Sequence, residues 1–168
     1  VGFQPLATIA GHAYFDTNGN GTQDTGEANL PTGTVVTLTP TGGGTPINTT
    51  LDAAGNYSVT VPVTTAYRAD VTDPASHRLT TANDPQTVTS GTTGSTVNAT
   101  PVGFQPMATI TGHAYFDTNG NGTQDTGEAN LPTGTVVTLT PTGGGTPINT
   151  ALDAVGNYSV TVPVTTAY

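Results

Sequence analysis

The chain has 168 residues, with eleven acidic and two basic side chains, and its formal net charge is −9. The two basic residues, Arg68 and Arg78, cannot form a basic patch, which disfavours nucleic acid as a partner. No apolar run reaches the length of a membrane span. Cysteine is absent, so a small extracellular domain would need a stabilising element other than a disulfide, and a bound metal ion is the obvious substitute.

Short β-strands separated by turns are predicted along the chain. Threonine, glycine and proline are abundant, and the segments between turns are rich in β-branched and aromatic residues, which favour strands. In chain order, strands are expected at Thr8–Phe15, Thr34–Thr39, Pro46–Leu51, Asn56–Val61, Ala66–Thr72, Thr87–Thr89 and Thr96–Thr100, leading into Val102–Pro106. Seven short strands in about 100 residues predict an all-β, immunoglobulin-like sandwich.

A twelve-residue loop, DTNGNGTQDTGE, separates the first two predicted strands. Oxygen-bearing side chains occupy loop positions 1, 3, 5, 9 and 12, and glycine occupies position 6, which is the ligand pattern of an EF-hand calcium loop. The predicted Ca²⁺ ligands are Asp16, Asn18, Asn20, Thr22 through its main-chain carbonyl, Asp24 and Glu27. Because strands flank the loop, we expect a structural metal site that links two strands rather than a helix–loop–helix calcium sensor. The alternative is a polar turn that binds no metal.

The same loop recurs 101 residues later, with predicted ligands Asp117, Asn119, Asn121, Thr123, Asp125 and Glu128. Residues 102–168 repeat residues 1–67 with four substitutions, none of them at a predicted ligand: Leu6 to Met107, Ala10 to Thr111, Thr50 to Ala151 and Ala54 to Val155. A period of this length matches one sandwich domain rather than a solenoid unit.

The period predicts three regions. They are a tail strand of a preceding repeat at 1–6, a complete β-sandwich repeat at 7–106 and an incomplete second repeat at 107–168. The chain is therefore expected to be a window of a longer array. Without counterparts of residues 68–101, the second repeat is expected to expose apolar side chains, or to receive the missing strands from another chain. The side chains expected to be exposed are Ile110, Val137, Leu139 and Tyr158.

Three segments carry a family resemblance. The pattern from Ile9 to Glu27, the turn from Leu51 to Tyr57, and the segments Val71-Thr-Asp-Pro and Leu79-Thr-Thr resemble the serine-aspartate-repeat B domain of bacterial surface adhesins, which is related to collagen-adhesin B-type domains. The resemblance implies tandem immunoglobulin-like sandwiches, each with a calcium loop, that form a stiff extracellular or cell-surface spacer. Many collagen-adhesin B-type domains carry a lysine-based isopeptide crosslink, which is impossible here because lysine is absent.

Other side chains with chemical potential are sparse. His12, His77 and His113 are too scattered for a catalytic centre, and His12 and His113, which share one repeat position, are assigned a structural or surface role. No G-x-S-x-G nucleophile turn occurs. Four further acids are interpreted either as a second, weaker calcium cluster or as turn caps: Asp52, Asp70, Asp73 and Asp84.

Two hypotheses for function follow. The first is a non-enzymatic, calcium-stabilised structural repeat of an extracellular adhesin, surface layer or filament, whose partners are neighbouring repeats or identical chains. A host or surface ligand is left open. The alternative is a carbohydrate-binding or accessory module of a secreted enzyme, which would need exposed aromatic rings on one face; tryptophan is absent.

Overall fold

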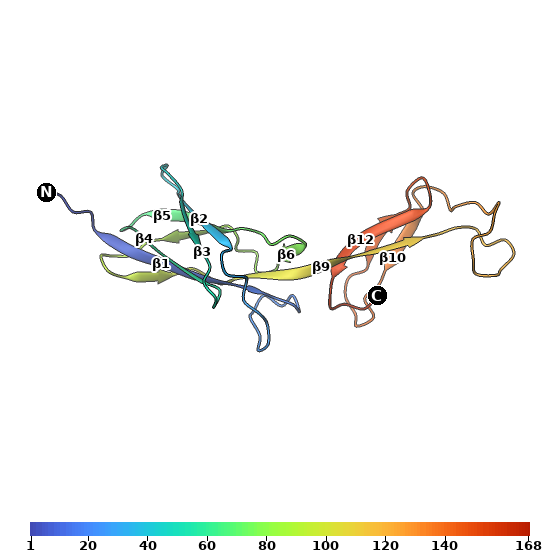
Figure 1. Ribbon diagram of the computed structural model, residues 1–168, viewed down its shortest axis with the longest axis horizontal. Helices are drawn as coiled ribbons and strands as arrows, with labels where there is room; N and C mark the ends of the chain where they lie inside the picture. The colour runs from blue at the N-terminus through green and yellow to red at the C-terminus, as the bar shows by residue number, and fades with distance from the viewer. The chain divides into compact units, whose positions relative to one another are not determined.

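The computed structural model describes residues 1–168, which are all-β and contain no helix. The chain divides into two compact units, Val1–Pro106 and Met107–Tyr168 (Figure 1). Eight strands lie within the first unit: β1 (Leu6–Phe15), β2 (Val35–Pro40), β3 (Ile47–Thr50), β4 (Asn56–Pro62), β5 (Ala66–Val71), β6 (His77–Leu79), β7 (Gln86–Thr89) and β8 (Thr96–Asn98). Strand β9 (Val102–His113) belongs to both units, and β10 (Val136–Leu139), β11 (Ile148–Ala151) and β12 (Asn157–Pro163) belong to the second.

The first sheet of the first unit is built around β1. Strand β4 pairs with it antiparallel, from Leu6 opposite Pro62 to His12 opposite Asn56. On the other edge β1 pairs parallel first with β8 and then, beyond Ala13, with the start of β9. Strand β6 adds to the far edge of β9 in antiparallel register. The end of β1, where the acidic loop begins, is therefore flanked by β9.

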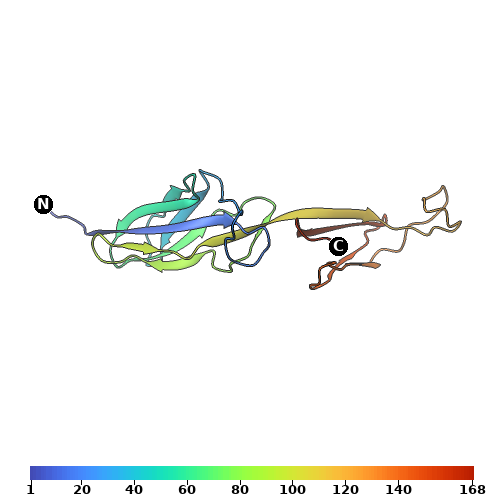
Figure 2. The ribbon, with the colours of Figure 1, turned by 90° about the horizontal axis from the view of Figure 1, so that it is seen from below.

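The second sheet of the first unit has the antiparallel order β3-β2-β5-β7. The two sheets pack on one apolar core, and Figure 2 shows the strands of the first unit at right angles to the view of Figure 1. Ile9 and Val61 from the first sheet and Val36, Leu38 and Tyr67 from the second are fully buried in one apolar cluster. Burial of each such side chain contributes about 1.5–3 kcal/mol, so the core holds the two sheets together as a sandwich.

One position in β1 must be glycine, because an aromatic ring packs directly on the strand there. The ring of Tyr57 lies directly over Gly11, where any side-chain carbon would collide with it. The second unit repeats the arrangement with Tyr158 over Gly112. The sequence pair of a strand glycine and a facing tyrosine is thus a packing feature of both repeats.

The strand predictions agree with the structure except in one segment. The expected strands all occur, with ends shifted by one or two residues, but β6 was not predicted as a strand. It is three residues long, and its single apolar residue, Leu79, gives no periodic signal; it forms because β9 offers a free edge. The segment Val1–Pro5 forms no strand and is exposed, and its assignment to a preceding repeat stays a prediction.

The second unit contains one antiparallel pair and one hairpin. Residues Met107–His113 of β9 pair with β12, and β10 pairs with β11. The prediction of exposure is wrong for Leu139, which is buried at 8% exposure because the β10–β11 hairpin folds back on β12. Ile110, Val137 and Tyr158 are half-buried, whereas their first-unit counterparts are buried.

Candidate metal centre

The first acidic loop leaves the end of β1 and is closed by main-chain bonds. The Asp16 N–H donates to the Phe104 carbonyl at 2.9 Å, and the Phe15 N–H donates to the Ala28 carbonyl at 2.8 Å. At loop position 6, Gly21 has φ of 81°, a left-handed conformation that glycine adopts without strain. The loop is therefore held at both ends and bends where an EF-hand loop bends.

Asp16, at loop position 1, organises the loop from inside. It is fully buried, and its carboxylate accepts the N–H groups of Gly19 at 2.8 Å, Asn20 at 3.1 Å and Gly21 at 2.7 Å. Burial by itself would raise the pKa of Asp16, but hydrogen bonds from Thr80 and from the three loop amides outweigh it and hold the pKa below its usual value. Asp16 is therefore a carboxylate at neutral pH.

The middle of the loop converges on Asp24. Its Oδ2 accepts the side-chain amides of Asn18 and Asn20, each at 2.7 Å. The amide oxygens of the two asparagines accept main-chain N–H groups two residues further on, at Asn20 and Thr22. Loop positions 3, 5 and 9 are thereby brought together by local contacts.

Glu27, at loop position 12, closes the loop. Its Oε1 accepts the Thr17 N–H at 2.7 Å and the Thr17 hydroxyl at 2.8 Å, and its Oε2 accepts the Asp24 N–H at 2.9 Å. The bond from Asp24 is the main reason why the pKa of Glu27 lies below its usual value, followed in the same direction by the bonds from Thr17 and Asn18. The carboxylates at positions 1 and 12 are thus both ionised, and main-chain hydrogen bonds hold both of them in position.

The donor set fits Ca²⁺, which takes six to eight oxygen ligands. Each loop offers three carboxylates, two amide oxygens and a main-chain carbonyl, and a carboxylate that accepts N–H groups keeps free lone pairs. No group of three or more His, Asp or Glu side chains is close enough to hold a metal ion by those side chains alone. A cation here would depend on the amide and main-chain oxygens, which a Ca²⁺ loop uses.

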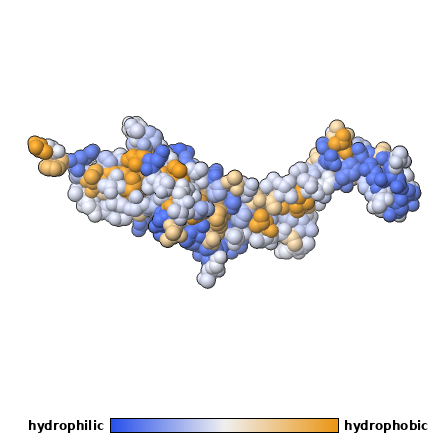
Figure 3. Space-filling view, viewed as in Figure 1, coloured by the Kyte–Doolittle hydropathy of each residue, from blue (hydrophilic) through white to orange (hydrophobic).

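The second loop repeats these bonds in a more open setting. Asp117 accepts the N–H groups of Gly120 at 2.7 Å and Gly122 at 2.8 Å, and Asp125 Oδ2 accepts the Asn121 amide at 2.7 Å. Asp117 is exposed where Asp16 is buried, and the loop surface is hydrophilic (Figure 3). The bond from the Asp125 N–H is the main cause that lowers the pKa of Glu128.

Gln105, which the sequence did not single out, supports the first loop. It is 3% exposed; its Nε2 donates to the Thr17 carbonyl at 3.3 Å, and its Oε1 accepts the Arg78 guanidinium at 2.9 Å. Its side chain lies against Gly19. Gln105 lies in a short apolar segment whose residues give no sign of a contact with the loop. The one signal in the sequence that could have indicated it is the recurrence of the VGFQP motif.

Three of the other acids have bonding partners of their own. Asp52 caps a turn by accepting the N–H groups of Ala54 and Asn56, Asp70 pairs with Arg68 at 2.9 Å, and Asp84 accepts the Val71 N–H. For Asp52 the turn-cap interpretation therefore holds. Tyr14, Tyr57 and Tyr67 are buried at 1–4% exposure and offer no open ring for a carbohydrate.

The two-sheet sandwich with its acidic loop at the end of β1 is an immunoglobulin-like structural module. The model of the SdrD B-like domain matches residues 7–107, and the chain belongs to that family. It is thus a cell-surface or extracellular module. The structure contains no helix, and therefore none that could span a membrane.

Known proteins give the chain's context. Serine-aspartate repeat-containing protein D of Staphylococcus aureus is 28% identical over 95% of the chain, which spans only 13% of that protein. The Bacillus anthracis TIE protein aligns over 95% of the chain and 26% of its own, with a TM-score of 0.47 and 14% identity. A streptococcal ancillary pilin aligns over 92% and 49%, with a TM-score of 0.46 and 14% identity.

Proposed function

We propose that the chain is a non-enzymatic structural module of an extracellular adhesin or surface filament, and that each acidic loop binds Ca²⁺. In this proposal Ca²⁺ serves as a structural crosslink within each repeat. The ligands would be the predicted residues at loop positions 1, 3, 5, 7, 9 and 12 of both copies, from Asp16 to Glu27 and from Asp117 to Glu128.

The observation that carries the proposal is the internal organisation of the loops. Three carboxylates and two asparagines fold into one loop in both copies, around a glycine with positive φ at position 6. Six of the eleven acids lie in these two loops. Their mutual repulsion costs stability unless a cation compensates it, and the tandem arrangement repeats that need in each copy.

The position of the first loop makes a structural role for the metal reasonable. Asp16 is joined through its N–H to Phe104 of β9, and Thr17 is joined through its carbonyl to Gln105. A cation that tightens the loop would therefore tighten β1 against β9. With asparagine at positions 3 and 5, each loop has three formal charges, so we expect a dissociation constant between roughly micromolar and millimolar.

Chelation tests the calcium proposal. A ligand that binds only the folded state stabilises it by mass action, so excess chelator should lower the melting temperature, and added Ca²⁺ should restore it. Mg²⁺ at equal concentration is the control, since it demands a tighter octahedral site. An unchanged melting curve in excess chelator would sink the structural-calcium proposal.

The spacer role requires a separate test. Near-identical copies 101 residues apart support an array of repeats or a polymer of identical chains. Small-angle scattering should report a stiffer particle with Ca²⁺ than with chelator if the loops stiffen the repeats. Binding to a glycan array with no change in scattering would favour the accessory-module alternative instead.

A further inference from the structure

One histidine in each repeat bridges two amide side chains. In the first unit, His12 Nδ1 lies 2.9 Å from Asn56 Oδ1, and its Nε2 lies 2.8 Å from Gln23 Oε1. In the second, the corresponding distances from His113 to Asn157 and Gln124 are 2.8 and 3.0 Å. The arrangement thus occurs twice, in units with different surroundings.

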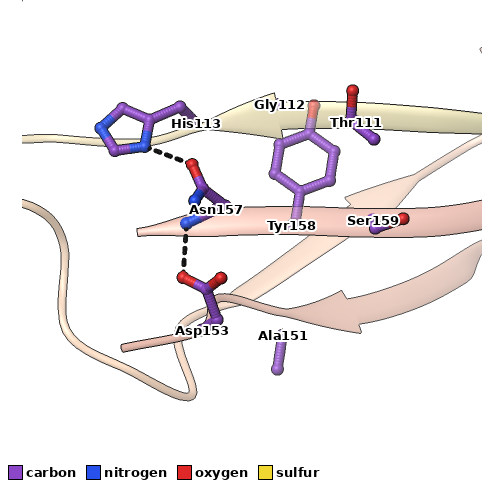
Figure 4. Close-up of a pocket in the computed structure, with 8 residues that line it drawn as sticks. All are labelled: Thr111, Gly112, His113, Ala151, Asp153, Asn157, Tyr158 and Ser159. Carbon is purple, nitrogen blue, oxygen red and sulfur yellow. Dashed lines mark hydrogen bonds between the residues drawn. The ribbon is translucent and has the colours of Figure 1, made fainter. Parts of the chain in front are cut away.

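Other hydrogen bonds fix which amide atom faces the ring in the second unit. The Gln124 Nε2 donates to the Glu128 main-chain carbonyl at 3.1 Å and to Asn130 Oδ1 at 2.8 Å, so Gln124 Oε1 must face the histidine. Asn157 is held beside the ring by its main-chain N–H, which donates to the Asp153 carboxylate at 2.9 Å (Figure 4).

His113 Nε2 therefore faces an acceptor oxygen and donates to it. Its Nδ1 lies against the Asn157 side chain. The ring is thus held from two sides, and it also stacks on Tyr115, with the ring centroids 6.0 Å apart.

Gln23 and Gln124 occupy loop position 8, between predicted ligands at positions 7 and 9. Each also holds the main-chain carbonyl of the glutamate at position 12. We propose that His12 and His113 are positioning residues for the calcium loops: by bridging the two amide side chains they clamp position 8, and with it the C-terminal half of the loop, to the first residue of the facing strand. The part of this inference that concerns Ca²⁺ affinity rests on the proposed function.

A double-mutant cycle in the second repeat tests the clamp. His113→Phe keeps an aromatic ring on Tyr115 but removes both bonds, and Gln124→Met removes the acceptor at position 8. Amide exchange of residues 117–128 is measured in excess chelator, with the first loop as internal reference; Ala10 in place of Thr111 distinguishes fragments from the two copies. Each variant should speed exchange of the second loop at least about two- to tenfold, the range expected for loss of one hydrogen bond, because each removes more than one.

The clamp requires that the two substitutions are not additive, because either one already removes the shared bond. Fully additive effects, or no effect of His113→Phe, would overturn it. His77→Phe is the matched control, since His77 stacks on Phe15 at 4.9 Å without touching either loop. His12→Phe should loosen the first loop in the same way.

Calcium titration of the same variants separates this inference from the proposed function. His113→Phe should weaken one of the two sites about two- to tenfold and leave the other unchanged. If no site binds Ca²⁺ but the exchange cycle shows coupling, the calcium proposal fails and the clamp stands. If both sites bind with unchanged affinity and exchange is unaltered, the clamp is wrong.

A spectroscopic signature tests the contact directly. The Nε2–H group of His113 should give an observable nitrogen-15 NMR correlation, because its proton is held in the hydrogen bond to Gln124. The signal should shift in Gln124→Met and stay unchanged in His77→Phe. A His113 signal that is the same with and without Gln124 would contradict the clamp.

Discussion

The two acidic loops have the same twelve residues and nearly the same internal hydrogen bonds, but they differ in burial. Asp16 is fully buried, with Thr80 among the groups that lower the pKa of its carboxylate and Gln105 packed on Gly19. Asp117 is exposed, and residues 107–168 contain no counterpart of Thr80 or Gln105. The loop is therefore built by its own sequence, whereas its burial is supplied by strands distant in the chain.

The segment VGFQP gives a second comparison of the same kind. At Val102–Pro106 it begins β9, and Phe104 is 1% exposed; at Val1–Pro5 the same residues form no strand, and Phe3 is 91% exposed. Figure 3 shows the hydrophobic side chains at the N-terminal end of the chain. A strand needs a neighbour that accepts its hydrogen bonds and covers its apolar side, and the sequence of the strand does not provide one.

The largest difference in stability is expected between substitutions of the two copies of this phenylalanine. Phe104→Ala should cost about 3–5 kcal/mol of unfolding free energy, because it opens a cavity in the core. Phe3→Ala should change stability by less than about 0.5 kcal/mol. Urea denaturation followed by circular dichroism measures both. Equal shifts for the two variants would contradict the burial difference.

The next largest difference in stability is expected between substitutions of Asp16 and Asp117, the aspartates at loop position 1. In chelator, Asp16→Ala should cost about 1–3 kcal/mol, because the partly buried N–H groups of Gly19 and Gly21 lose their acceptor. Asp117→Ala should cost less, since water replaces the lost acceptor. In calcium titrations each variant should lose only its own site, which isothermal calorimetry can count.

Gln105→Leu should make the first loop behave more like the second. The change removes the bonds to Thr17 and Arg78 while it keeps the volume, and about 0.5–1.5 kcal/mol of local stability should be lost with each bond. Amide exchange of residues 16–27 should rise toward that of residues 117–128. The matched control is Gln4→Leu, the same residue in the exposed copy, which should leave the exchange unchanged.

The smallest expected effect concerns Asp84. Burial, reinforced by the charges of Asp70 and Asp73, raises its pKa to about 6, although the Val71 N–H opposes the shift. Its folded-state pKa thus exceeds the unfolded one, so its stabilising contribution is complete below about pH 4 and is lost as the pH rises through about 6. Asp84→Asn should stabilise the first unit at pH 8 by up to about 1 kcal/mol after allowance for solvent screening, and have little effect at pH 4. Melting curves at the two pH values measure this difference, and equal shifts at both would contradict it.

The sequence by itself predicted the strands of the first unit other than β6, and the acidic loops, since both depend on residues close together in the chain. The bonds from Asp16 to Gly19, Asn20 and Gly21 span three to five residues and follow from the glycines and asparagines between them. For the same reason they recur at Asp117 without the support of the remaining strands.

The tertiary structure alone decided the rest. Strand β6, the burial of Leu139 and the contact of Gln105 with the first loop all depend on partners distant in sequence. Identical residues at Val1–Pro5 and Val102–Pro106 adopt different structures because backbone hydrogen bonding and apolar burial are satisfied between segments. A local sequence determines which groups a strand or loop offers, and only the folded neighbours determine which of those groups are bonded and buried.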